Sequence, residues 1–293
     1  MNILLTGGNG FLGSVINNEL EKYHNVYNLS RSKGDFICDL SKQSPDFSSH
    51  SFDGVVHVAG LAHQISGSAK SEFSKVNVLG TKNLFNSFKE KKPKWVVFIS
   101  SVAVYGLEKG ELIDETYPLS GSSDYALSKI EAENWLQEWG DEHEVSILIL
   151  RLPLVVGDKP PGNLAKMIQG IKKGRYVSIN KGKAKRSAVL AEDVAELLSV
   201  NFDKSGIYNL SDRNDFSFRE LEEVICKLLG KNLPFSIPLF LAKYIGIIGD
   251  ILDVSRFNSD VINKMTNELT FSSKRASEDL GWNPKKVIDN FPL

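Results

Sequence analysis

A glycine-rich stretch at residues 6–13 constrains the fold more than any other part of this sequence. It reads Thr-Gly-Gly-Asn-Gly-Phe-Leu-Gly, follows the apolar run 2–5 and continues into apolar residues with helical spacing. A strand that turns into a helix across three glycines predicts a tight turn, a bare backbone and close helix packing. The unpaired N–H groups that open such a helix suit a pyrophosphate. We therefore predict a dinucleotide site that includes Gly7, Asn9, Gly10, Phe11, Leu12 and Gly13.

The rest of the first half alternates between strand-like and helical patterns. Strands are predicted at 2–5, 25–29, 53–58, 95–99 and 145–150, and helices at 11–22, 69–91 and 123–143. This alternation predicts an α/β fold, namely a doubly wound parallel Rossmann sheet that binds its ligand at the carboxyl ends of the strands. We expect an NAD(P)-binding Rossmann domain over residues 1–152.

After residue 152 the pattern loosens into a Pro- and Gly-containing loop and shorter elements. We predict helices at 163–173, 191–202, 217–230 and 239–252. Residues 153–293 are expected to form a smaller C-terminal α/β region, mainly a substrate-binding cap, with 206–210 rejoining the main sheet as a strand.

Composition excludes some partners and leaves others open. The formal net charge is -1 and 24% of residues are charged, so neither nucleic acid nor an anionic membrane is indicated. The two cysteines, Cys38 and Cys226, have no spacing suited to a metal or a disulfide framework, and a reducing cytoplasm fits best. The apolar stretch 239–252 contains Lys243 and Asp250 and is too short to span a bilayer. It is expected to be a buried or partner-facing helix, with peripheral membrane contact as the lesser alternative and no membrane insertion.

Residues at the ends of the next strands are candidates for cofactor contacts. Ser30 and Arg31 end the second strand, where a hydroxyl and a guanidinium suit a 2′-phosphate, which favours NADP over NAD. Asp35, also spaced to bind a ribose, keeps NAD open. Asp39, which Leu40 follows, could place a carboxylate beside the adenine. Ala59 and Gly60 are small residues that would let the cofactor pass over the sheet edge, and Asn77 is a polar residue on a helix that should line the same crevice.

The sequence Tyr125-Ala-Leu-Ser-Lys129 predicts the reacting centre. Residues four apart on a helix share a face, so the phenol and the ammonium can point at one place. A nearby cation favours tyrosinate, which can then act as a general base. Ser101 follows the predicted strand 95–99, at the carboxyl edge of the sheet where ligands bind. It could hydrogen-bond a substrate oxygen that changes between alcohol and carbonyl. These three residues predict a hydride-transfer site.

In order along the chain, these motifs resemble those of the extended short-chain dehydrogenase/reductases, and more narrowly the NAD-dependent epimerase/dehydratase family of nucleotide-sugar enzymes. The resemblance rests on Thr6-Gly7-x-x-Gly10-x-x-Gly13, Asp39-Leu40, Ala59-Gly60, Val76-Asn77-x-x-Gly80-Thr81, Ser100-Ser101-x-x-Val104-Tyr105-Gly106, Tyr125-x-x-x-Lys129 and Leu150-Arg151-x-Pro153. It implies Ser101, Tyr125 and Lys129 as the catalytic triad, with Tyr125, Lys129 and Pro153 also at the cofactor. It further implies a nucleotide-sugar substrate that contacts Ser101, Tyr125, Asn163 and Arg186, and a homodimer formed through helices 69–91 and 123–143.

Departures from subgroup patterns narrow the chemistry that the resemblance implies. Val102 and Ala103 stand where sugar 4,6-dehydratases carry an acid–base pair, and no cysteine follows the serine as in the GDP-fucose synthase type. What remains is a 4-epimerase or a 4-ketoreductase acting at C4 of a UDP-linked hexose or N-acetylhexosamine. Leu154 stands where UDP-galactose 4-epimerases carry a substrate-binding Asn, and His63 lies near the expected pocket mouth, with or without a role. A non-catalytic NAD(P)-sensing protein is the alternative of a different class.

Overall fold

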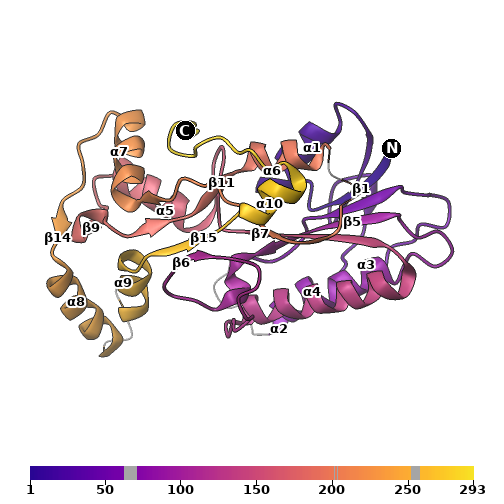
Figure 1. The fold of residues 1–293 in the computed structure, drawn as a ribbon, viewed down its shortest axis with the longest axis horizontal. Helices are drawn as coiled ribbons and strands as arrows, with labels where there is room; N and C mark the ends of the chain where they lie inside the picture. The colour runs from indigo at the N-terminus through magenta and orange to yellow at the C-terminus, as the bar shows by residue number, and fades with distance from the viewer. Residues whose placement is uncertain (63–70, 201, 203, 252–257) are drawn as a thin grey trace.

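A seven-stranded sheet forms the centre of the computed structural model, which describes residues 1–62, 71–200, 202, 204–251 and 258–293 (Figure 1). Every neighbouring pair of its strands is parallel, and the order is β12-β7-β5-β4-β1-β2-β3. The strands are β1 (Asn2–Thr6), β2 (Asn25–Ser30), β3 (Phe36–Ile37), β4 (Gly54–His57), β5 (Trp95–Ser101), β7 (Ser146–Leu152) and β12 (Gly206–Asn209). The order runs outward from β1 in both directions, so a ligand crevice is expected beyond the carboxyl ends of β1 and β4.

Helices cover both faces of this sheet, as the doubly wound prediction requires. One face carries α1 (Phe11–Leu20), α6 (Ala191–Leu198) and α10 (Lys274–Leu280), and the other α3 (Gly80–Phe85) and α4 (Asp124–His143). Because side chains alternate along a strand, β1 sends Ile3 and Leu5 into the first core and Leu4 into the second. The sheet is thus buried on both sides, which explains its apolar strand sequences.

The helix predicted at 69–91 is shorter and less regular than expected. Its described part consists of α2 (Ser71–Phe73), a π-helical segment η1 (Ser74–Leu79) and α3, which ends at Phe85. Beyond it the Ser87 hydroxyl donates to the Leu84 carbonyl, and Phe88 turns into an aromatic cluster with Phe47 and Phe52. The prediction of a helix up to residue 91 was therefore wrong, because burial of Phe88 ends the helix early. The helix predicted at 191–202 likewise ends sooner, at Leu198.

A second region lies beside the main sheet. Its four-stranded sheet has the order β13 (Phe216–Ser217), β10 (Lys185–Arg186), β15 (Leu269–Phe271) and β6 (Gly110–Ile113). Two smaller pairs join β8 (Leu154–Val156) to β11 (Ala188–Leu190), and β9 (Ser178–Ile179) to β14 (Ser236–Ile237). Helices α5 (Gly162–Lys172) and α7 (Phe218–Leu229) share one core here. The chain crosses between the regions, since β6 lies in this sheet and β12 lies in the main one.

Helices α8 (Leu239–Ile251) and α9 (Ser259–Thr266) lie, together with β14 and α7, toward the end of the second region that points away from the main sheet (Figure 1). Ala242 of α8 packs into a small core with Ile179 and Ile262, whereas Phe240 and Tyr244 are exposed. Within the described ranges, no helix is long and apolar enough to cross a bilayer.

Candidate active site

The glycine-rich turn between β1 and α1 leaves a helix N-terminus open. Gly7 has φ +76°, and a Cβ there would lie 2.7 Å from the Ala59 nitrogen. A Cβ on Gly13 would lie 2.0 Å from the Gly7 carbonyl oxygen, so α1 approaches the turn as closely as only glycine allows. Gly10 is the N-cap of α1, which has no side-chain cap and no acidic residue in its first turn. The first N–H groups of α1 can therefore bind an anion.

The other residues predicted in this turn have different roles. The Asn9 amide donates to the Ser30 hydroxyl (3.0 Å) and to the Lys33 carbonyl (2.7 Å), which ties the turn to the end of β2. Leu12 is part of the core, and Phe11 packs against Gly157. Leu12 can thus reach a ligand only through its backbone.

Residues at the ends of β2 and β3 are largely committed to their own turns. The Ser30 hydroxyl donates to the Lys33 carbonyl at 2.5 Å and accepts from the Lys33 N–H at 3.0 Å, whereas Arg31 is exposed. The Asp39 carboxylate accepts from the Ser41 hydroxyl (2.7 Å), and this bond and that to Lys42 hold its pKa below the usual range. The Leu40 carbonyl accepts from Asn83 (2.8 Å). Among the predicted polar contacts here, Arg31 is the side chain most available to a phosphate.

The end of β4 meets the π-helical segment η1 through Asn77. The buried Asn77 amide accepts from the Leu61 N–H (2.7 Å) and donates to the Leu61 carbonyl (3.1 Å) and the Ser128 hydroxyl (2.9 Å). A Cβ on Gly60 would lie 3.2 Å from the Asn77 amide oxygen and 3.4 Å from Lys129 Nζ. Asn77 therefore clamps the loop after Ala59 and Gly60 against α4. His63, predicted near the pocket mouth, lies outside the described residues.

The three residues predicted to be catalytic come together at the carboxyl end of β5. Ser101 ends β5, caps the 3-10 turn η2 (Val102–Tyr105) by accepting from the Ala103 N–H (3.2 Å), and lies beside Tyr125. Tyr125 lies in the first turn of α4, whose N-cap is Ser123. One turn later, the ammonium of Lys129 donates to the Ile99 carbonyl at 2.9 Å and lies 4.6 Å from the Phe98 ring centre.

Burial sets the protonation of this group. It lowers the pKa of Lys129 to about 8, against the opposing effect of the Glu133 carboxylate. Burial also raises the pKa of Tyr125 above its usual value, and the hydrogen bond to Ser101 offsets part of that rise. Near neutral pH the side chains therefore stand as a neutral phenol beside an ammonium. That ammonium stabilises any negative charge that develops on the phenol oxygen.

A buried polar network that the sequence analysis did not assign lies behind the triad. Glu133, one turn after Lys129 on α4, forms an ion pair with Arg151 of β7 at 2.6 Å and accepts a hydrogen bond from Ser100. Arg151 also donates to the Tyr105 hydroxyl (3.1 Å), which donates to Asn209 of β12 (2.8 Å). The signal in the sequence was a carboxylate at i+4 from Lys129 and an arginine inside an apolar strand.

His57 is a second buried polar residue that sequence reasoning missed. The Thr81 hydroxyl donates to the Asn77 carbonyl (2.6 Å), so His57 Nε2 must donate to Thr81 Oγ1 (2.9 Å). His57 Nδ1 then accepts from the Thr6 hydroxyl (2.6 Å). Burial lowers the pKa of His57 to about 3, which makes it a neutral link between β1, β4 and α3.

Two of the four predicted substrate residues, Ser101 and Tyr125, belong to the triad, whereas Asn163 and Arg186 lie in the second region. Asn163 is exposed in the first turn of α5. Arg186 of β10 donates to the carbonyls of Lys264 and Asn267 at the end of α9, and burial lowers its pKa. Its guanidinium thus stabilises a helix C-terminus in this structure. Pro153 connects β7 to β8, and Leu154 is exposed on β8.

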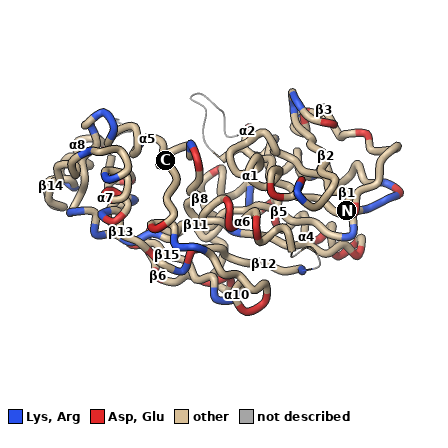
Figure 2. Tube along the Cα trace, turned by 90° about the horizontal axis from the view of Figure 1, so that it is seen from above, with Lys and Arg blue, Asp and Glu red and all other residues tan. Residues whose placement is uncertain are grey.

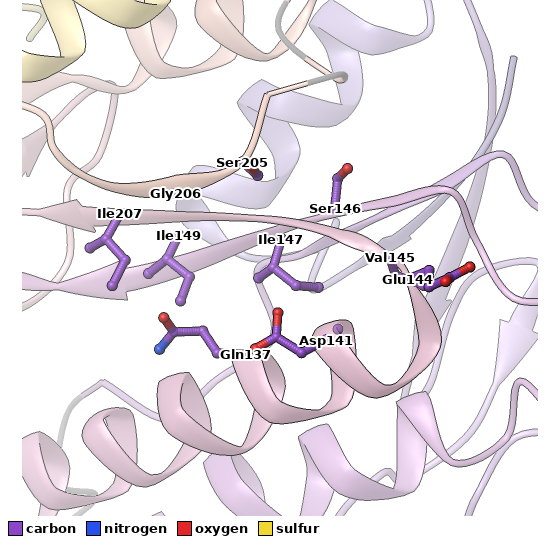
Figure 3. A pocket seen from close by; sticks show the side chains of 11 residues that line it. Gln137, Asp141, Glu144, Val145, Ser146, Ile147, Ile149, Ser205, Gly206 and Ile207 are labelled. Atoms are coloured by element: carbon purple, nitrogen blue, oxygen red, sulfur yellow. The ribbon is translucent and has the colours of Figure 1, made fainter.

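A cavity of about 440 Å³ lies away from this site, between the C-terminal part of α4, β7 and β12 (Figure 3). Gln137 and Asp141 of α4 and Ile207 of β12 contribute to its lining. Another cavity, of about 390 Å³, lies beside β6. Neither is lined by Ser101, Tyr125 or Lys129. In the part of the chain that the structure describes, no group of three or more His, Cys, Asp and Glu side chains could hold a metal ion.

The arrangement of these groups along the parallel sheet defines a class of protein. A glycine turn follows the first strand, a serine ends β5, and the tyrosine of a Tyr–Lys pair on the next long helix lies beside that serine. This is the organisation of the extended short-chain dehydrogenase/reductases, to which we assign the chain.

Comparison with known proteins narrows the assignment. The chain belongs to the NAD dependent epimerase/dehydratase family, whose model matches residues 3–211. It is 27% identical over 280 residues to an Escherichia coli O157:H7 N-acetyl-alpha-D-glucosaminyl-diphospho-ditrans,octacis-undecaprenol 4-epimerase, covering 91% of this chain and 81% of that protein. It is also 27% identical over 313 residues to a Vibrio cholerae UDP-glucose 4-epimerase, covering 98% and 92%. The fold matches a Thermus thermophilus UDP-glucose 4-epimerase in complex with NAD, with a TM-score of 0.75, 24% identity and coverage of 97% and 94%.

Proposed function

We propose that this protein is a nicotinamide-dependent enzyme that oxidises and reduces C4 of a sugar carried on a diphosphate, and that it acts as a 4-epimerase. The observation that carries the proposal is the placement of Ser101 and Tyr125 side by side at the carboxyl end of β5, with Lys129 one turn behind. The relatives that are named as 4-epimerases support C4 as the reacting carbon. A 4-ketoreductase uses the same three residues and stays the alternative.

The residues of the glycine turn fit a dinucleotide. A Cβ at Gly7 or Gly13 would collide with backbone, so the turn is built for close approach, and the first N–H groups of α1 have no side-chain partner. These groups would hold the pyrophosphate, Arg31 would lie near the adenine ribose, and Lys129 would reach the nicotinamide ribose. When bound, the cofactor supplies the acceptor for a hydride from C4 and can return it.

The triad would handle the proton at the reacting carbon. In its tyrosinate form, after loss of the phenol proton, Tyr125 Oη would take the proton of the C4 hydroxyl. The Ser101 hydroxyl would hold the substrate oxygen as it becomes a carbonyl. The Lys129 ammonium favours the tyrosinate form while it is protonated, below its pKa of about 8. Val102 and Ala103 follow the serine, so no carboxyl group is present there to drive elimination of water. Reaction without elimination is what 4-epimerisation and 4-ketoreduction share.

Cofactor choice separates these two reactions. An epimerase benefits from NAD that stays bound, whereas a reductase needs NADPH that exchanges on every turnover. Arg31 supports a 2′-phosphate, but the Ser30 hydroxyl is already committed to the Lys33 backbone, which weakens the case for NADP. The test is to purify the protein without added nucleotide and identify what stays bound. Retained NAD with turnover in the absence of added cofactor supports the epimerase, whereas consumption of NADPH supports the reductase.

Two carriers for the sugar follow from different observations. A nucleotide such as UDP is the first candidate, in line with the Vibrio cholerae relative. A polyprenyl diphosphate is the second, in line with the Escherichia coli relative. Turnover of UDP-N-acetylglucosamine compared with its undecaprenyl-diphosphate counterpart distinguishes the two.

The catalytic role of Tyr125 is tested by Tyr125→Phe. Loss of a general acid–base group is expected to lower kcat by roughly 10²–10⁴-fold, with cofactor affinity little changed. Tyr117→Phe is the matched control, because Tyr117 is exposed near β6 and should leave turnover unchanged. Undiminished turnover in Tyr125→Phe would refute the mechanism. A wild-type protein that binds the cofactor but turns over neither the nucleotide-linked nor the polyprenyl-linked sugar would instead support the alternative of a non-catalytic NAD(P)-sensing protein.

A further inference from the structure

Helix α8 presents large apolar side chains to solvent. Phe240, Tyr244, Ile247 and Ile248 have the spacing of a single helical face and are 67%, 67%, 53% and 53% exposed. We call these four residues the α8 face. The helix lies at the end of the molecule's long axis, far from α3 and α4 (Figure 1).

The opposite side of α8 carries small residues, and these make its contacts with the protein. Ala242, Gly246 and Gly249 are buried, and a Cβ on Gly246 would lie 3.2 Å from Ile262 of α9. In an ordinary surface helix the large apolar residues point inward and the polar ones outward. The reversed arrangement leaves the α8 face without a partner in the described part of the chain, and a contiguous apolar patch of this kind marks an interaction surface.

Two exposed lysines border the α8 face. Lys243 is exposed on α8 itself, at the border of the face. Lys181, also exposed, lies beside β14, since its N–H donates to the Ser236 hydroxyl at 2.8 Å. Asp250, the acidic residue of α8, is exposed, and the hydrogen bonds that it accepts from Ser259 hold its pKa below the usual range, so it keeps one negative charge against the two lysines. Figure 2 shows Lys and Arg positions around α8 and β14. An anionic partner complements this surface.

We propose that the α8 face docks onto the surface of an anionic lipid bilayer, with α8 lying in the plane of the interface. Apolar side chains flanked by lysines are the combination that binds such a surface. At 13 residues, α8 is about 20 Å long and does not span the bilayer. The inference goes beyond the proposed reaction, because it concerns where the enzyme works and holds for either sugar carrier.

A second copy of the chain fits the α8 face less well. The exposed parts of its four side chains amount to roughly 400–500 Å², below the roughly 800 Å² per partner of a stable interface. The dimer expected for this family would use the helices around α3 and α4, at the other end of the molecule (Figure 1). Shallow insertion into a bilayer has no such minimum area, since affinity grows with each buried side chain and each lysine.

Co-sedimentation with vesicles tests the proposal on the full chain. We expect wild type to bind vesicles of phosphatidylglycerol and phosphatidylcholine, to bind pure phosphatidylcholine less, and to dissociate as salt rises. The triple variant Phe240→Gln, Tyr244→Gln, Ile247→Gln should lower the partition coefficient by roughly tenfold or more. The matched control is Tyr23→Gln with Val200→Gln, because these residues are 65% and 72% exposed outside α8, and binding should be unchanged.

Three results would overturn the proposal. They are wild type that ignores both kinds of vesicle, a triple variant that binds as well as wild type, and a wild-type oligomer that the triple variant dissociates. The last would assign the α8 face to a second copy. Turnover of a soluble nucleotide sugar should be equal in wild type and the triple variant, which separates loss of docking from failure of the proposed reaction.

Discussion

Removal of Arg151 should destabilise the protein far more than removal of an exposed arginine. Arg151 donates to both carboxylate oxygens of Glu133, at 2.6 Å and 3.2 Å, and the two side chains are 3% and 0% exposed. In Arg151→Met the buried Glu133 carboxylate still accepts the hydrogen bond from the Ser100 hydroxyl. It loses the guanidinium that pairs with its negative charge, and no solvent reaches it in place of that group. Breaking a buried pair in this way costs about 3–5 kcal/mol of the free energy of unfolding.

Two further variants separate the charge effect from lost packing. Adding Glu133→Gln to Arg151→Met removes the unpaired charge and should restore at least about 2 kcal/mol. Arg219→Met is the matched control, since Arg219 pairs with Glu223 at 2.7 Å on the surface of α7, and it should cost about 0.3–0.5 kcal/mol.

Equilibrium unfolding in urea, followed by tryptophan fluorescence, measures all of these variants. A loss below about 1 kcal/mol at neutral pH, or a double variant no more stable than the single one, would refute this account.

Two other predictions concern the glycine turn and a buried acid. In Gly13→Ala the new Cβ would lie 2.0 Å from the Gly7 carbonyl oxygen, so the turn must shift. Cofactor affinity measured by calorimetry should therefore fall by roughly tenfold or more. The control Gly174→Ala, where no atom lies within 4 Å of the new Cβ, should leave cofactor affinity unchanged. Burial raises the pKa of Asp212 to about 6, so the folded protein binds the extra proton and the free energy of unfolding should fall as pH rises from about 4 to 6. Asp212→Asn should flatten that dependence in denaturant unfolding at several pH values, and an unchanged slope would show that other acids cause it.

Local patterns in the sequence were sufficient to predict the frame of the fold and the centre of the site. The glycine turn, the alternation of strands and helices, and the Tyr125–Lys129 spacing depend on backbone geometry within a few residues. The structure has the predicted doubly wound parallel sheet, and it brings Ser101, Tyr125 and Lys129 together.

Only the tertiary structure decided what lies around that centre. The network from Glu133 through Arg151 and Tyr105 to Asn209 joins four segments, and the Tyr105–Asn209 bond spans 104 positions of the chain. The early end of α3, the commitment of Ser30 and Asn77 to backbone partners, and the outward orientation of α8 also depend on distant segments. Periodicity specifies which residues share a face of an element. What that face meets depends on how all the elements pack, because burial and pairing are properties of the whole molecule.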